Sequence, residues 1–331
     1  MVFDKGRIPG GRLASHLAPG LEVDVGAQYF TVRDERFDRH VQPWRVAGVV
    51  ARWDGRICAL PERGGALVDT PALERLVGTP TMNAIAAHLG RDVDVRSSHR
   101  VDEIERRGAG FALAGTVGAP GVTLGPRVEA DEGPRVGFGT FDVVLVCLPP
   151  DQVHPLVRAV SPALAATVAP VVSVPCVALG FAPVGDAMRD LPFDGLFVGR
   201  DDDDGRVLSW IARDSSKPGR PAGERWVVHA APAWSRDHLR DPRDAIERAL
   251  LDELARTFDL PPLAATASTV RRWALARAPA PLTAEALFDP DGALGVGGDW
   301  SAGGRVEGAF VAGVALAERV LGLAPGAAVS S

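Results

Sequence analysis

Three observations on the sequence predict a protein of the α/β class with about two domains. The chain has 331 residues, which is enough for about two domains of ordinary size. The stretch Phe141–Leu148 (FDVVLVCL) is apolar throughout and ends at two prolines, which is typical of a parallel strand buried on both faces. Residues 151–270 then alternate between helical and strand-like stretches.

The composition is that of a globular protein with a substantial core, with 46% hydrophobic and 24% charged residues. The 36 basic and 42 acidic residues give a formal net charge of −6, and they form no basic stripe. This balance argues against a nucleic-acid partner and against electrostatic binding to a membrane surface. Three cysteines without metal-like or redox-like spacing predict a reduced, cytoplasmic setting and no metal site.

Periodicity and turn residues place the further elements along the chain. Pro242–Phe258 carries an apolar stripe and is predicted to be an amphipathic helix. The other predicted elements are a strand that enters a glycine turn within Leu21–Thr31, a helix over Arg33–Ala47, a strand–turn–strand unit over Val49–Ala59, a helix that opens at Thr79–Thr81 and stops at Gly90, a strand over Val93–Val101, a β-meander within Arg107–Thr140, a strand over Leu294–Asp299 and a helix over Ser301–Leu323.

A first candidate site lies near the N-terminus, where Asp4 ends a strand-like stretch and Gly10, Gly11 and Arg12 follow. A carboxylate at a strand end can accept both hydroxyls of a ribose. Glycines allow the backbone to approach a pyrophosphate, and an arginine can pair with its oxygens. Taken alone, the same residues also suit a surface turn.

Two further candidates are a strand that ends in glycines and a segment that holds the chain's one tyrosine. Gly298 and Asp299 lead into a helix rich in Gly and Ala, whose N-terminus offers free N–H groups and partial positive charge. A closely packed core helix is the alternative. Tyr29 follows Gln28 in the segment GAQYFT, and a core aromatic is the alternative there.

Together these segments resemble the renalase-like flavoproteins within the FAD-dependent amine oxidase superfamily. The resemblance covers nearly the whole chain. It is carried by VFDKGRIPGGR, DVGAQYFT, GTPTMNAIAAHL, ARDSSKPGR, WVVHAAPAWS and GDWSAGGRVEGAFVAGVALAERVL.

The resemblance implies FAD as the cofactor and a Rossmann-like FAD-binding domain beside a substrate domain with a mixed sheet. It implies an FAD-binding domain of residues 1–40, 76–150 and 262–325, and a substrate domain of residues 41–75 and 151–261. By resemblance, Asp4 binds the adenosine ribose, and Gly10, Gly11 and Arg12 contact the pyrophosphate and ribityl chain. Gln28 and Tyr29 lie along the flavin, Val101 contacts the adenine, Asp299 holds the pyrophosphate or ribityl end, and Val306 meets the isoalloxazine.

The sequence departs from this family at its beginning. The family opens with a strand, a GxGxxG loop and a helix before the strand that ends in the ribose carboxylate, whereas only three residues precede Asp4 here. We expect a misassigned start within the second strand. A truncated, non-enzymatic remnant without flavin is the alternative.

The expected reaction is transfer of a hydride from a small reduced substrate to the flavin, with oxygen as the final acceptor. The resemblance implies an isomeric dihydronicotinamide dinucleotide as the substrate. Oxidation of an amine or a desaturation is the alternative. No catalytic residue is identified, because the seven histidines are scattered; Lys217 suits either a place near the active site or a solvent-exposed turn.

Overall fold

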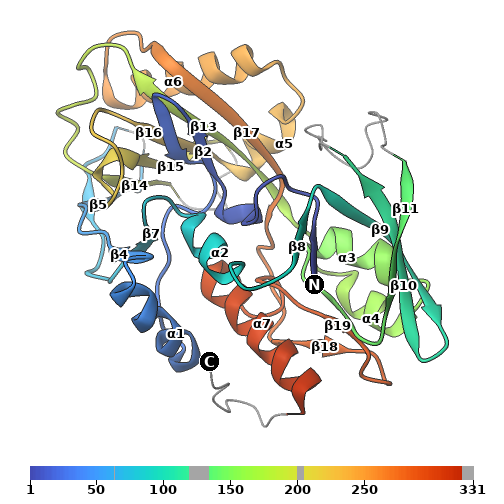
Figure 1. Cartoon of the computed structure of the whole chain (residues 1–331). Coiled ribbons are helices and arrows are strands. Elements are labelled where there is room, and N and C mark those ends of the chain that lie inside the picture. Colours follow the sequence, from blue (N-terminus) through green and yellow to red (C-terminus); the bar gives the residue numbers. More distant parts are fainter. Residues whose placement is uncertain (63, 119–133, 200–204, 323–331) are drawn as a thin grey trace.

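The computed structural model describes all of the chain except residues 63, 119–133, 200–204 and 323–331. A seven-stranded mixed sheet fills one part of the molecule (Figure 1), in the order β17-β13-β16-β15-β14-β5-β6. Its neighbouring strands are antiparallel except for the parallel pair β14 and β5. The strands are β5 (Ile57–Leu60), β6 (Val68–Asp69), β13 (Val174–Pro183), β14 (Gly195–Val198), β15 (Leu208–Arg213), β16 (Trp226–Ala230) and β17 (Ala265–Arg277).

The outer face of this sheet packs on helices. Alternate residues of the strands point to the same side, and Leu179 of β13 and Val228 of β16 are fully buried there against Leu250 of α6 (Arg243–Phe258). Helix α5 (Pro232–His238) packs against β13. The predicted amphipathic helix is therefore confirmed, with Pro242 as its N-cap.

The opposite face, here called the inner face, turns toward the rest of the molecule. The hairpin of β2 (Ser15–Ala18) and β3 (Leu21–Asp24) packs on it, with Val23 against Val227. Gly180 permits this approach, because a Cβ at that position would lie 2.6 Å from Val23 Cγ2. The strand predicted to enter a glycine turn within Leu21–Thr31 is confirmed as β3. It ends at Asp24, whose backbone carbonyl accepts a hydrogen bond from the Gln28 side chain.

The other parallel strand pairs lie in two small sheets. In one, β1 (Val2–Asp4) pairs with β8 (Val95–Ser97); in the other, β12 (Val144–Val146) pairs with β19 (Leu294–Val296), which also pairs with antiparallel β18 (Leu287–Phe288). The predicted parallel strand over Phe141–Leu148 is confirmed in type but is shorter. Phe141 belongs to the preceding antiparallel strand, and the chain changes sheets at Asp142 and Val143.

The predicted β-meander is confirmed for the described residues as β9 (His99–Arg107), β10 (Gly110–Val117) and β11 (Arg135–Phe141). This sheet shares a core with β12, β19 and the helices α3 (Pro150–Val157) and α4 (Pro162–Val168). The single strand predicted over Val93–Val101 is wrong. Ser98 takes φ 59°, which separates β8 from β9.

Three helices and two short strands complete the part that faces the inner sheet surface. They are α1 (Glu35–Val46), α2 (Ala84–Leu89), α7 (Arg305–Leu321), β4 (Val50–Arg52) and β7 (Leu76–Gly78). The strand–turn–strand unit predicted over Val49–Ala59 does not pair with itself, because β4 pairs with β7 and β5 joins β14. The Arg56 N–H donates to Asp194 Oδ2 at 2.9 Å, which draws the chain to the larger sheet.

No helix in the described part of the chain is long and apolar enough to cross a membrane.

Shortening a buried side chain of α6 tests the outer-face core. We expect Leu250→Ala to lower the free energy of unfolding by about 2–5 kcal/mol, because it leaves a cavity in the core. Arg248→Ala on the exposed side of the same helix is the matched control, and it should change stability by less than about 0.5 kcal/mol. Urea denaturation measures both, and equal losses would contradict this account of the core.

Candidate functional site

The first predicted segment forms a tight loop after β1. Asp4 ends the strand, and its Oδ1 accepts a hydrogen bond from the Gly6 N–H at 2.7 Å. Gly10 and Gly11 take φ values of 130° and 49°, which favour glycine, and Gly11 begins the 3-10 helix η1 (Gly11–Leu13). This loop turns the chain back so that Arg12 points toward the C-terminal segments.

Arg12 and Asp299 form a bidentate ion pair, although they are 287 positions apart in the sequence. Arg12 Nη1 lies 3.0 Å from Asp299 Oδ2, and Arg12 Nη2 donates to Asp299 Oδ1. Arg12 Nη1 also donates to the Ala276 carbonyl at 2.9 Å. The side chain of Asp299 is 10% exposed and that of Arg12 is 31% exposed, so one edge of the pair stays accessible.

Four fully buried charged side chains, Asp24, Asp214, Lys217 and Arg220, form what we call the charge cluster. Lys217 Nζ lies 2.6 Å from Asp214 Oδ1 and 3.1 Å from Asp24 Oδ2. Arg220 Nη2 donates to the same oxygen of Asp24. The cluster joins the end of β3 to the 3-10 turn η2 (Asp214–Ser216) that follows β15.

The charge cluster also fixes Gln28. Lys217 Nζ donates to Gln28 Oε1 at 3.2 Å, and Gln28 Nε2 donates to the carbonyls of Asp24 and Gly26. These hydrogen bonds engage both the oxygen and the nitrogen of the amide, so its orientation is set. The Met82 N–H donates to Asp24 Oδ1 at 2.9 Å, which ties the entry of α2 to the same carboxylate.

The two carboxyls of the cluster differ in their titration. Burial raises the pKa of Asp24, but the charges of Lys217 and Arg220 and the Met82 N–H outweigh it, and the net pKa is lowered. For Asp214, burial and the nearby charge of Asp24 raise the pKa despite Lys217. Asp24 is therefore the stable anion of the cluster, and Asp214 holds a proton more readily.

Tyr29 lies among aromatic rings on the inner side of the sheet. Its ring centroid is 6.3 Å from that of Trp53 and 5.7 Å from that of Trp210. Trp53 Nε1 donates to Ser216 Oγ at 3.0 Å, and Lys217 Nζ lies 5.7 Å from the Trp53 ring centroid. The aromatic group therefore adjoins the charge cluster directly.

Val306 stands in the first turn of α7. It packs in the same apolar cluster as Tyr29 and Trp210. The helix begins after Gly304, and no side-chain cap binds its first N–H groups. Glu307 in its first turn accepts from the N–H groups of Arg33 and Asp34, which holds α7 against α1.

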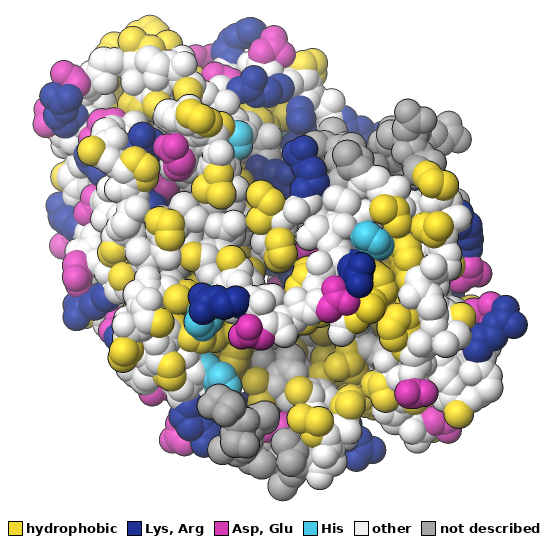
Figure 2. All heavy atoms as spheres, viewed as in Figure 1, with side chains coloured by type: hydrophobic (Ala, Val, Ile, Leu, Met, Phe, Trp, Pro, Cys, Tyr) yellow, Lys and Arg dark blue, Asp and Glu magenta, His cyan; other side chains and the backbone are white. Residues whose placement is uncertain are grey.

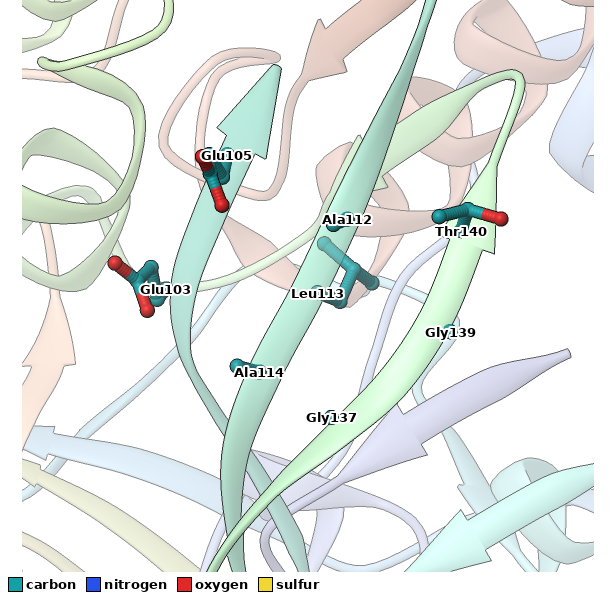
Figure 3. A pocket seen from close by; sticks show the side chains of 8 residues that line it. All are labelled: Glu103, Glu105, Ala112, Leu113, Ala114, Gly137, Gly139 and Thr140. Carbon is teal, nitrogen blue, oxygen red and sulfur yellow. The ribbon is translucent and has the colours of Figure 1, made fainter. Parts of the chain in front are cut away.

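Val101 lies apart from these contacts. It sits on β9 opposite Gly115, and it packs with Phe3 in the core below the meander. The same sheet carries a hollow of about 270 Å³ (Figure 3), but none of the predicted site residues lines it. It is lined by Glu103, Glu105, Ala112, Leu113, Ala114, Gly137, Gly139 and Thr140.

Sequence reasoning missed most of the charge cluster. Asp24 and Arg220 were not singled out, and of the two readings of Lys217 the solvent-exposed turn is wrong. One signal was available: Lys217 is one of only two lysines beside 34 arginines. Among the described residues, no group of three or more His, Cys, Asp or Glu side chains could hold a metal ion.

These features define a class of site. An arginine–carboxylate pair, an uncapped helix N-terminus and a wall of aromatic rings can hold a planar ligand with an anionic tail. The site lies between the inner face of the mixed seven-stranded sheet and the segments that carry the two small sheets with parallel strands.

Comparison with known proteins agrees with this class. The family model described as flavin-containing amine oxidoreductase matches residues 53–321, and the chain belongs to that family. Its cofactor is accordingly FAD.

Two solved structures of other proteins share the fold. A variant of putrescine oxidase is 10% identical and has a TM-score of 0.60, over 97% of this chain and 93% of that chain. A protein from Exiguobacterium sp. 255-15, named provisionally as a protoporphyrinogen oxidase, is 11% identical with a TM-score of 0.58, over 83% and 80% of the two chains. At these identities the likeness concerns the fold alone.

Neutralising each carboxyl of the charge cluster tests its electrostatics. We expect Asp24→Asn to destabilise the protein by about 3–5 kcal/mol at pH 7, because it leaves two buried cations short of their anion. Asp214→Asn should cost less, because burial and the charge of Asp24 raise the pKa of this carboxyl and so make its ionised form less favourable. Urea denaturation measures both variants.

The same two variants should also differ in pH dependence. The stability that Asp24 contributes is present above its ordinary pKa of 3.8 and is lost as pH falls through its lowered value. The contribution of Asp214 is present below 3.8 and is lost as pH rises through its raised value. The cost of Asp214→Asn should therefore shrink as the pH rises, and a cost that grows with pH would refute the assignment.

Proposed function

We propose that this chain is a renalase-like, FAD-dependent oxidoreductase that takes a hydride from a small reduced substrate, with oxygen as the final acceptor. The observation that carries the proposal is the charge cluster. It joins two renalase-like segments, DVGAQYFT and ARDSSKPGR, through Asp24, Lys217 and Arg220. A third such segment, WVVHAAPAWS, supplies β16, the strand next to β15.

The residues present fit an FAD. Arg12 would hold the pyrophosphate and Asp299 the ribityl end, because their pair keeps an accessible edge. Asp4, at the end of β1, would bind the adenosine ribose. Gly10 and Gly11 have no side chains, so the cofactor could approach their backbone closely. Val101 would lie against the adenine.

The other predicted residues would surround the flavin ring. Gln28 and Tyr29 would lie along it, and Val306 would bring the uncapped start of α7 to its pyrimidine side. We assign residues 1–40, 76–150 and 262–325 to FAD binding, and residues 41–75 and 151–261 to substrate binding.

The FAD supplies a two-electron acceptor at N5 of the flavin. The chain's own part is positioning. The charge cluster holds Gln28 in one orientation, while Trp53 and Trp210 pack beside Tyr29. Hydride transfer needs such placement more than it needs an acid or base.

The substrate we propose is an isomeric dihydronicotinamide dinucleotide. Support comes from the renalase-like segments that meet in the cluster. Oxidation of an amine is the second candidate. It is favoured by the amine oxidoreductase family itself and by the putrescine bound to a wild-type putrescine oxidase of similar fold, which is 9% identical with a TM-score of 0.54.

Anaerobic mixing separates these candidates. We expect isomeric dihydronicotinamide dinucleotides to bleach the flavin absorbance and putrescine to leave it unchanged. If only amines bleach the flavin, amine oxidation replaces oxidation of a dihydronicotinamide dinucleotide as the proposed reaction. A protein that shows no flavin band even after FAD is added would instead be the non-enzymatic remnant.

Substitution of Arg12 tests the cofactor assignment. We expect Arg12→Lys to weaken FAD binding by about tenfold or more, because lysine cannot reproduce the forked contact of a guanidinium. Arg248→Lys, on the exposed face of α6, is the control. Quenching of flavin fluorescence during titration gives the dissociation constants. If Arg12→Lys binds FAD as tightly as the control does, Arg12 is not part of the FAD site.

A further inference from the structure

Arg75 is a buried cation that has no carboxylate partner among the described residues. It is 8% exposed, and two other buried cations, Lys217 and Arg225, are 2% and 9% exposed. Lys217 pairs with Asp24, and Arg225 Nη2 lies 3.7 Å from Glu22 Oε2. A buried charge is tolerated when a partner completes it, so Arg75 calls for an acceptor that the described chain does not supply.

The carboxylates nearest to Arg75 in the sequence are held by other arginines. Glu74 pairs with Arg45, and Asp69 pairs with Arg56. The segment that carries Arg75 therefore leaves the positive charge of its guanidinium uncompensated.

The guanidinium of Arg75 is fixed in place, yet many of its donors are unused. Its Nη1 donates to the Leu73 carbonyl at 3.2 Å, and its Nη2 donates to Thr70 Oγ1 at 3.1 Å. These bonds use two of the five N–H groups of a guanidinium. Within the described part of the chain, Nε is buried without a hydrogen-bond partner. The Arg75 carbonyl accepts from the Trp53 N–H at 2.9 Å, which ties this segment to the aromatic group.

Arg75 lies against the aromatic group of Tyr29, Trp53 and Trp210. Its Cζ is 5.4 Å from the centroid of the Tyr29 ring. Lys217 approaches the same group, with Nζ 5.7 Å from the centroid of the Trp53 ring. The charge of Lys217 is balanced by the carboxyls of the charge cluster, whereas that of Arg75 is not. Arg75 therefore gives the aromatic group a positive electrostatic potential.

The aromatic group remains open to a ligand. Tyr29, Phe197 and Val306 belong to its apolar cluster and are only partly buried. Figure 2 shows that the molecule is hollowed between its two lobes, with hydrophobic side chains along the hollow. A flat ring stacked on Tyr29 would lie in a partly dehydrated place, where the charge of Arg75 acts more strongly than it does in water.

We propose that Arg75 determines specificity by binding an oxygen of a carboxylate or carboxamide on the substrate's ring and by disfavouring an ammonium there. The proposal rests on the oxidoreductase function above and adds to it a residue and a charge preference. A guanidinium donates well to either oxygen. A cation at the same place would meet like-charge repulsion, so amines are selected against.

Three flat probes of nearly equal shape test this preference on the FAD-loaded protein. Benzoate is an anion, benzamide is neutral and benzamidine is a cation at pH 7. The change in flavin absorbance during titration gives their dissociation constants, and the flavin band gives the FAD content. We expect the unaltered protein to bind benzoate most tightly and benzamidine least tightly.

Substitution of Arg75 should remove this order. We expect Arg75→Gln to weaken benzoate by about tenfold or more, as loss of a charged hydrogen bond predicts. Benzamide should weaken less, benzamidine should not weaken, and the FAD content should stay the same. Arg75→Lys keeps the charge and should preserve the order of the three probes. Arg52→Gln removes an exposed arginine next to Trp53 and is the matched control, which should leave all three affinities unchanged.

Each other outcome overturns the assignment. Unchanged affinities in Arg75→Gln, or no binding of benzoate by the unaltered protein, would show that Arg75 binds no such oxygen. Equal weakening of all three probes would show a merely structural role, and loss of FAD would assign the guanidinium to the cofactor. The proposed function can fail separately: if no dihydronicotinamide compound reduces the flavin but benzoate binding still depends on Arg75, the assignment of Arg75 stands. If reduction occurs and the probes ignore Arg75, only this assignment falls.

Discussion

Burial of four charged side chains in one place constrains the whole site. Removing a charge from water costs far more than a single hydrogen bond returns, so such a group is tolerated only when its partners are complete. Asp24 meets this condition by accepting from Ser15, Met82, Lys217 and Arg220. These contacts fix the end of β3, the entry of α2 and the turn after β15 at once. Gln28 is oriented by the same cluster, because its amide binds Lys217 and the Asp24 carbonyl.

The two faces of the seven-stranded sheet carry different kinds of side chain. The outer face is apolar and closed by α6, so its residues contribute mainly to stability. On the inner face, the strand registers bring Trp210, His229 and Arg271 onto one side of the sheet.

Sequence patterns predicted the parts of the fold that depend on local rules. The α/β class, the helices at Arg33–Ala47 and Pro242–Phe258 and the parallel strand before Pro149 follow from periodicity and turn residues, and they are confirmed. Strand partners were harder: β4 and β5 are neighbours in sequence but join different sheets. The charge cluster escaped prediction because Asp24 and Lys217 look like ordinary surface residues until the fold buries them. Arg12 and Asp299, which the resemblance implied, do meet.

The sequence distance between Asp24 and Lys217 has a consequence for assembly. Contacts between distant positions form late, because the chain must first close a long loop. The cluster cannot exist until β3 and the turn after β15 both reach the inner face. An incompletely folded chain therefore lacks the site altogether rather than holding a weakened form of it. Ligand binding therefore requires that the long stretch of chain between Asp24 and Lys217 has already closed.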